Sequence, residues 1–191
     1  RAALWLVVGA GSVDEDDDQL GLAHMTEHMA FNGTANFPRQ ALVNYLESVG
    51  MQFGPEVNAY TNQDETVYML QVPTDPPELL ATGLQILEEW AHRVSFEDTE
   101  IDKERGVIIE EGRLGRGADE RMYDAQLPII FHGSRYAARN TIGDPDLIKS
   151  FPHDTIRRFY RDWYRPDLMA VVAVGDFDQA AVEAAIRARF A

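Results

Sequence analysis

The sequence contains no cysteine, and this absence excludes two kinds of structural device. Disulfide bonds cannot form, and metal sites built from thiolates are ruled out, so any bound metal must use histidine and carboxylate ligands. Long apolar runs are also missing, since none approaches the roughly 18 residues that a membrane-spanning helix requires. The longest runs, ALWLVV and LMAVVAV, have the length of β-strands, and we expect no membrane span.

Positive charge is scarce in this chain. Lysine and arginine together number 17 against 32 aspartates and glutamates, which gives a formal net charge of −15 at pH 7. Proteins that bind nucleic acids present basic faces to the phosphates, so this balance argues against a nucleic-acid partner. An anionic membrane surface is disfavoured for the same reason.

The length and composition indicate one globular domain. A chain of 191 residues can bury a sizeable core, and 45% hydrophobic with 26% charged residues is typical of a water-soluble protein. We therefore expect a single domain over residues 1–191. The chain opens inside an apolar strand, RAALWLVV, so we expect it to be a segment of a longer polypeptide. The lack of a leader peptide then carries no information about the compartment.

Apolar periodicity and turn residues predict both strands and helices along the chain. Strands are predicted at residues 3–8, on both sides of the polar turn Asn62–Glu65, and at 168–175. Helices are predicted around 21–32, 37–50, 75–94 and 98–114, in the segment that ends at Tyr164, and from Asp176 onward. Residues 131–146 are predicted to be irregular. The order of these elements predicts an α+β fold with helices packed on a mostly antiparallel sheet.

The segment HMTEH places two histidines and a glutamate within five positions. On a helix, His24 and His28 project from the same face one turn apart, so both imidazoles can bind one cation such as zinc. Glu27 can then reach a metal-bound water without ligating the metal. This order, H-x-x-E-H, inverts the commoner H-E-x-x-H and is the inverzincin signature. For so short a motif, the alternative of two ordinary helix histidines beside a solvated glutamate stays open.

A third ligand has to come from another element, because a catalytic zinc ion takes three protein ligands and leaves one position for water. The predicted helix at 98–114 carries an apolar stripe formed by Ile101, Val107, Ile108 and Leu114. Glu104 and Glu111 fall within this stripe, and a buried carboxylate without a partner is costly, so both acids call for a cation. Glu110 is expected to be solvated. An amphipathic helix with acids at its margin remains the alternative.

Five segments follow one another in the order found in the N-terminal half of the M16 zinc metallopeptidases: GLAHMTEHMAFNGT, EVNAYTNQDETVYMLQVP, DKERGVIIEEGR, IGDPDLIKSF and FYRDWYRPDLMAVVAVGDFD. That family includes insulysin, pitrilysin and the mitochondrial processing peptidases, and the chain resembles its bacterial members over nearly its whole length. The resemblance implies an M16/LuxS-type metallohydrolase half. It also implies one Zn²⁺ per chain, held by His24, His28 and Glu111, with Glu27 as the general base.

The resemblance further implies how the site is supported and what it does. Glu104 would support the site from behind the ligands, where such groups orient them. Asn58 and Ala59 would lie on an edge strand to which an extended peptide adds by backbone pairing. The expected reaction is hydrolysis of peptide bonds by a metal-activated water. The expected substrates are peptides or small unfolded proteins, and the expected place is the bacterial periplasm or cell envelope.

The chain departs from the family in one respect. Enzymes of this family are built from two related halves, and the second half supplies an arginine and a tyrosine that hold the substrate. No segment here matches that half, so a C-terminal half-domain is the expected partner, and the chain alone is expected to be weakly active or inactive. A non-catalytic peptide-binding or assembly module stays open as an alternative, although such modules usually lack the full ligand set. A purely structural zinc site would leave Glu27 without a role.

Other charged and aromatic segments are given structural interpretations. His92, His132 and His153 have no partner at ligand spacing and are expected to be structural or surface residues. The run Asp14–Asp18 is expected to be a solvated loop before a helix whose N-terminal end favours carboxylates. The cluster RRFYRDWYR mixes basic and aromatic residues, as RNA-binding proteins sometimes do. In so acidic a chain, we expect it to pack its aromatic rings and to pair its arginines with acids.

Overall fold

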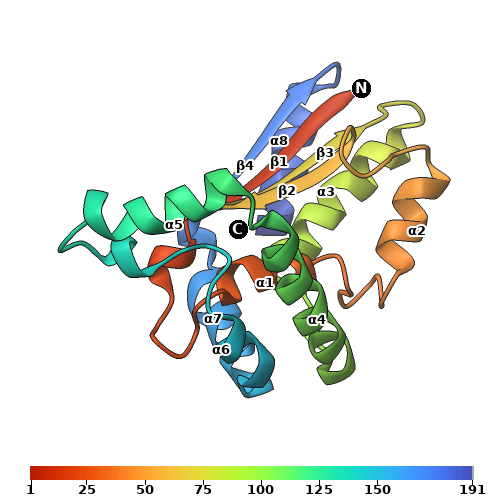
Figure 1. The fold of residues 1–191 in the computed structure, drawn as a ribbon. Helices are drawn as coiled ribbons and strands as arrows, with labels where there is room; N and C mark the ends of the chain where they lie inside the picture. Colours follow the sequence, from red (N-terminus) through yellow and green to blue (C-terminus); the bar gives the residue numbers. More distant parts are fainter. Residues whose placement is uncertain (191) are drawn as a thin grey trace.

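The fold is built around a four-stranded antiparallel sheet in a computed structural model that describes residues 1–190 (Figure 1). The strands, in the sheet order β2-β3-β1-β4, are β2 (Val57–Thr61), β3 (Thr66–Val72), β1 (Ala2–Val8) and β4 (Met169–Gly175). The register of β1 runs from Ala2 opposite Val72 to Val8 opposite Thr66 on one side, and from Ala2 opposite Gly175 on the other. The predicted strands and the α+β class are confirmed, and within the described residues β2 forms one edge of the sheet.

Eight α-helices accompany the sheet in residues 1–190. They are α1 (Leu22–Met29), α2 (Ala41–Ser48), α3 (Pro77–His92), α4 (Asp98–Gly115), α5 (Ala118–Ile130), α6 (Pro145–Ser150), α7 (His153–Trp163) and α8 (Gln179–Phe190). Short 3₁₀ turns lie at Ser12–Asp14, Arg135–Ala138 and Pro166–Leu168. Across residues 1–190, no helix is both long enough and apolar enough to cross a membrane.

One face of the sheet carries the core. β1 alternates strictly: Ala2, Leu4, Leu6 and Val8 are fully buried, whereas Trp5 on the opposite face is 40% exposed. Helices α3 and α8 lie against the buried face, and α1, α4, α6 and α7 gather at one end of the sheet (Figure 1). The approach of α3 is close, because a Cβ added at Gly83 would lie 2.8 Å from Leu4 Cδ1.

The cluster RRFYRDWYR on α7 has the structural role that its composition predicts. Phe159 is fully buried, and Tyr164 donates or accepts a 2.8 Å hydrogen bond with buried Tyr68. The arginines pair with acids, as Arg158 does with Asp18 at 2.6 Å. The prediction that this segment packs its aromatic rings and pairs its arginines with acids is therefore confirmed.

Two helices were not predicted. Helix α5 buries only Leu127, contains Pro128 and follows the glycines Gly115 and Gly117, so its sequence shows little apolar periodicity. Helix α6 has six residues, too few for a period, and the Asp144 side chain caps it by accepting the N–H groups of residues 146 and 147. The segment 131–146, predicted to be irregular, contains the turn Arg135–Ala138 and the start of α6.

Two expectations about helix boundaries and faces were wrong. The helix predicted at 37–50 begins only at Ala41, so Pro38 precedes it. The apolar stripe predicted on α4 is only partly buried, because Ile101 and Ile108 are buried while Val107 and Leu114 are 48% and 70% exposed. The reason is the direction of the side chains, since a turn of about 100° per residue places Val107 and Leu114 roughly 120–140° around the helix from Ile101, away from the buried face.

Candidate metal centre

Helix α1, which carries the HMTEH segment, begins at a buried carboxylate. Both Glu15 oxygens accept the Gly21 N–H at 3.0 Å, and one of them accepts the Ala23 N–H at 2.8 Å. The first N–H groups of a helix lack intrahelical partners, so this carboxylate satisfies them. Burial raises the pKa of Glu15 to about 8, while the N–H donors and Arg139 act in the opposite direction. Glu15 belongs to an acidic run that we expected to be solvated, and this part of that expectation was wrong.

The two histidine rings of α1 lie next to each other and face Glu111 of α4. The ring centroids of His24 and His28 are 4.7 Å apart. His24 Nε2 lies 3.8 Å from Glu111 Oε1, and His28 Nε2 lies 3.5 Å from Glu111 Oε2. These distances are long for hydrogen bonds. They are close to the separation of about 3.3 Å that follows for tetrahedral ligands with zinc bonds of about 2.0–2.1 Å.

The donor set therefore fits a metal ion in number, kind and spacing. One ligand atom from each of His24, His28 and Glu111 can be chosen so that all three lie within 4.8 Å of one another. Two imidazoles and one carboxylate are a common ligand set for a zinc ion that keeps a position open. Glu111 is half-exposed, with 51% of its side chain accessible, so the site opens to solvent on that side.

His28 contacts Glu104 on the side of its ring that faces away from Glu111. The Nδ1–H of His28 donates to Glu104 Oε1 at 2.8 Å, and Asn32 Nδ2 donates to Glu104 Oε2 at 2.5 Å. With Nδ1 held by Glu104, the neutral ring that binds a metal would present the lone pair of Nε2 to the ion. Burial lowers the pKa of His28, but the hydrogen bond and charge of Glu104, together with Glu27 and Glu111, outweigh it and raise that pKa.

His24 has a different environment from His28. Burial, reinforced by the neighbouring His28, lowers the pKa of His24 to about 4, so its imidazole is neutral at physiological pH. Neutral imidazole is the form that binds metals. Among the residues that the structure describes, the buried Nδ1 of His24 has no hydrogen-bond partner. A buried polar atom left without a partner is unusual in a protein and calls for a ligand or a water.

Glu27 lies beside the three candidate ligands and outside their cluster. It is buried, and Thr61 of β2 donates its hydroxyl to Glu27 Oε2 at 2.7 Å. Burial raises the pKa of Glu27, against the effects of the Thr61 hydrogen bond and the nearby His28. A buried carboxylate with a raised pKa is suited to exchanging protons near neutral pH. The contact from Thr61 was not predicted, because no local spacing connects the two residues.

A cavity of about 500 Å³ joins these residues to the edge of the sheet. Its lining includes His24, Glu27, His28, Ala59, Glu111 and Tyr123. Of the two residues predicted on an edge strand, Ala59 lines this cavity, whereas Asn58 is exposed on the same strand. The Ala59 N–H donates to the side chain of Asn58 at 2.9 Å and not to β3. Glu110 is exposed and binds Arg113, which confirms that it points away from the site.

Comparisons with known proteins agree with this geometry. A family model described as Insulinase (Peptidase family M16) matches residues 1–117, and one described as Peptidase M16 inactive domain matches residues 150–191. The Arabidopsis thaliana protein named Zinc protease PQQL-like is 46% identical over 177 residues, which are 93% of this chain and 18% of that protein. Probable zinc protease PqqL of Escherichia coli is 40% identical over 184 residues, or 96% of this chain and 20% of that protein.

A solved structure shows the same fold. The first half of the periplasmic protease PqqL from Escherichia coli has a TM-score of 0.94 and 39% sequence identity, and the match covers 99% of this chain and 40% of that one. The chain spans about a fifth of the length of the curated relatives named above. Because the family model matches more than half of the residues, the chain belongs to the insulinase family of peptidases, M16, and is similar to the N-terminal half of the bacterial zinc protease PqqL.

Proposed function

We propose that this chain is the metal-binding, catalytic half of a zinc endopeptidase. One observation carries the proposal: His24 Nε2, His28 Nε2 and the Glu111 carboxylate converge at 3.5–3.8 Å, too far apart to satisfy one another and well spaced to share an ion. Glu27 lies beside them in the same cavity. The relatives named as zinc proteases support the same reaction class.

The roles of the residues follow from their contacts. When bound, zinc would lower the pKa of a water molecule and polarise the carbonyl of the substrate. Glu27 would accept the proton of that water at the oxygen not held by Thr61 and later pass it to the leaving amine. Glu104 would hold His28 in the orientation and tautomer that leave Nε2 free to bind.

The substrate would be an extended peptide or a small unfolded protein that adds along β2. Within the described residues the ladder partner of β2 is β3, and Val57 also forms a single bridge with Phe53, so no strand pairs with the other edge beyond Val57. Ala59 of that strand lines the cavity. Its N–H donates to the Asn58 side chain and would exchange this hydrogen bond for one to a backbone carbonyl of the substrate. We further propose that a second half-domain completes the active site and that the protein works in a bacterial periplasm, as the PqqL of known structure does.

Two other functions fit the site less well. A peptide-binding or assembly module without catalysis would have no use for a complete set of ligands with a buried carboxylate beside them. A purely structural zinc site is normally closed by four protein ligands. Here three candidate ligands border a cavity of about 500 Å³, which leaves room for water and a substrate.

The test compares zinc content and peptide hydrolysis in the full-length protein. We expect wild type to bind one zinc ion per chain, Glu27→Gln to keep zinc while losing hydrolysis, and His24→Ala to lose both. Glu110→Gln is the matched control, because it makes the same chemical change one residue from Glu111 at an exposed position. A wild-type protein without zinc affinity, or full hydrolysis by Glu27→Gln, would overturn the proposal.

A further inference from the structure

Helix α4 carries both carboxylates that face α1, yet its last buried side chain, Ile108, comes before Glu111. The buried side chains of α4 are Ile101, Glu104 and Ile108. Glu111 lies six residues beyond Arg105, about 9 Å along the helix axis. A tilt of about 6° at Arg105 would therefore move Glu111 by about 1 Å, and such a shift is large for a metal ligand. The position of Glu111 depends on what holds the first half of α4.

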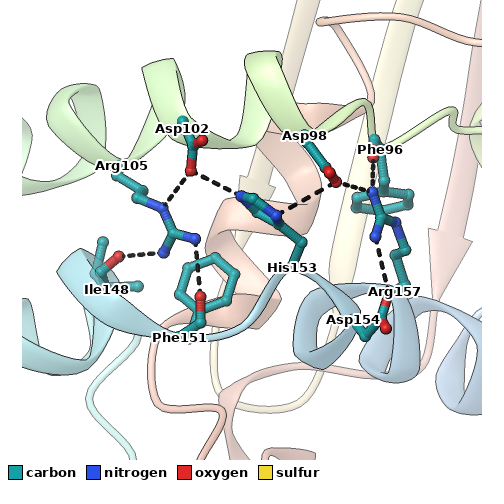
Figure 2. A network of polar contacts seen from close by, with 9 residues as sticks. All are labelled: Phe96, Asp98, Asp102, Arg105, Ile148, Phe151, His153, Asp154 and Arg157. Atoms are coloured by element: carbon teal, nitrogen blue, oxygen red, sulfur yellow. Dashed lines mark hydrogen bonds and ion pairs between the residues drawn. The ribbon is translucent and has the colours of Figure 1, made fainter.

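Arg105 joins α4 to the end of α6 (Figure 2). Its guanidinium donates to the carbonyl oxygens of Ile148 at 2.7 Å and Phe151 at 2.8 Å, and it lies 3.9 Å from the centre of the Phe151 ring. Its Nε donates to Asp102 at 3.0 Å. Carbonyls at the end of a helix lack intrahelical partners, so this one side chain satisfies two of them and is itself only 13% exposed.

The segment that Arg105 holds also contacts α1. We call residues 142–151 the bridging segment. At one end, Gly143 lies against Gly21 so closely that a Cβ on Gly143 would be 2.3 Å from Gly21 Cα. Asp144 donates its N–H to Leu20 O at 3.4 Å. The bridging segment therefore touches the start of the histidine helix and, through Arg105, the middle of the glutamate helix.

The first turns of α4 are tied to α7 by a second group of contacts (Figure 2). His153, the first residue of α7, lies with Nε2 2.8 Å from Asp102 Oδ1 and with Nδ1 3.3 Å from Asp98 Oδ1. Arg157 pairs with Asp98 and donates to Phe96 O at 2.7 Å. Asp102 is thus shared between His153 and Arg105, so the two groups of contacts form one network along α4.

We propose that Arg105 is a positioning residue for the metal site, which sets the distance between the carboxylates of α4 and the histidines of α1 through the bridging segment. Arg105 touches none of the candidate ligands and acts on them through the backbone of α4. The inference rests on the proposed function, because it assumes that His24, His28 and Glu111 bind zinc.

The experiment measures zinc affinity by chelator competition in the full-length protein, with Arg105→Ala and Arg105→Lys. Lysine keeps the charge but lacks the planar fork that reaches two carbonyls at once. We expect the Kd for zinc to rise about tenfold in Arg105→Ala and by a smaller factor in Arg105→Lys. The d–d absorption bands of the cobalt(II)-substituted protein should shift, because the Glu111 ligand moves. If Arg105→Ala fails to fold, Arg105→Lys alone decides.

Two controls separate positioning from loss of stability. Lys103→Ala removes an exposed cation of the same helix that pairs with Glu100 inside α4, and it should change the Kd by less than twofold. Leu84→Ala destabilises the core on α3 and should lower the melting temperature without changing the Kd or the cobalt spectrum at a temperature where the protein is folded. Unchanged zinc affinity and an unchanged cobalt spectrum in both Arg105 variants would overturn this inference alone. A wild-type protein that binds no zinc would overturn the proposed function and this inference with it.

Discussion

His28 and Glu104 are 76 positions apart in the chain, and a 2.8 Å hydrogen bond joins His28 Nδ1 to Glu104 Oε1. This contact connects the helix of the histidines to the helix of the acids at a point behind the candidate ligands. Both acids lie on the same side of α4, but they face different atoms. Glu104 contacts Nδ1 of His28, whereas Glu111 faces Nε2 of both histidines. The contact also determines which nitrogen of His28 is free to bind.

Removal of the Glu104 carboxylate should weaken zinc binding. In Glu104→Ala, His28 loses the partner that holds its ring and its tautomer, and we expect the Kd for zinc to rise 10- to 100-fold. Chelator competition measures the change. Glu100→Ala, one turn earlier on α4, is the control, because Glu100 pairs with exposed Lys103. A Kd equal to that of wild type in Glu104→Ala would contradict this role.

The Thr61 hydroxyl should affect catalysis more than substrate binding. Thr61→Val removes the 2.7 Å hydrogen bond to Glu27 without changing the shape of the side chain. Hydrogen bonds to charged groups contribute about 1.5–3 kcal/mol, so we expect kcat in the full-length protein to fall about 10- to 150-fold while KM and zinc content stay the same.

Thr61→Ser restores the hydroxyl and should recover most of kcat. Thr82→Val is the matched control, since Thr82 lies on an exposed part of α3 and donates to Glu78 O. If Thr61→Val and wild type have the same kcat, Thr61 does not orient Glu27.

The close contact between Gly143 and Gly21 should make Gly143 intolerant of a side chain. A Cβ on Gly143 would lie 2.3 Å from Gly21 Cα and 2.5 Å from Leu20 O, both backbone atoms that cannot move aside cheaply. Gly50 has a similar positive φ, 79° against 75°, with no atom within 4 Å of an added Cβ.

Gly50→Ala should therefore lower the free energy of unfolding by about 1–2 kcal/mol, because alanine is strained in the left-handed conformation. Gly143→Ala should lower it by about 2 kcal/mol more, because the added Cβ also clashes with backbone atoms. Urea denaturation of both variants measures the difference in the free energy of unfolding. Equal losses would mean that the bridging segment does not press against α1.

The stability of the protein should decrease between pH 5 and 8 because of Glu15. Burial raises the pKa of Glu15 to about 8 in the folded state, above the 4.5 of a solvated glutamate. In this pH window the folded protein binds more protons at Glu15 than the unfolded chain does, so the free energy of unfolding falls as pH rises, by at most about 1.4 kcal/mol per pH unit.

Glu15→Gln mimics the protonated form and keeps an oxygen that accepts the N–H groups of Gly21 and Ala23. The variant should lose this part of the pH dependence and gain stability relative to wild type as pH rises from 5 to 8. Denaturation of wild type and Glu15→Gln at pH 5, 6.5 and 8 measures the difference in their free energies of unfolding. Parallel curves for the two proteins would mean that the helix N-terminus keeps the Glu15 carboxylate ionised throughout this range.

The sequence by itself determined the strands, most of the helices and the spacing of the candidate ligands. The four-residue spacing of His24 and His28 places both on one face of α1, because that face follows from the helical period alone. The same period put Glu104 and Glu111 on one side of α4. Short apolar runs bounded by glycines or polar turns specified the strands, and the order of the elements along the chain specified an α+β fold with a mostly antiparallel sheet.

The tertiary structure decided which side chains from different elements meet. Thr61 reaches Glu27, Glu15 turns inward from an acidic run, and Arg105 binds the end of a helix that periodicity could not predict. Helix α5 was missed for a related reason, since a helix with one buried side chain has almost no periodic signal. Local patterns reflect short-range sterics and burial. A contact between distant segments depends on how every intervening element packs, and no spacing within one segment contains that information.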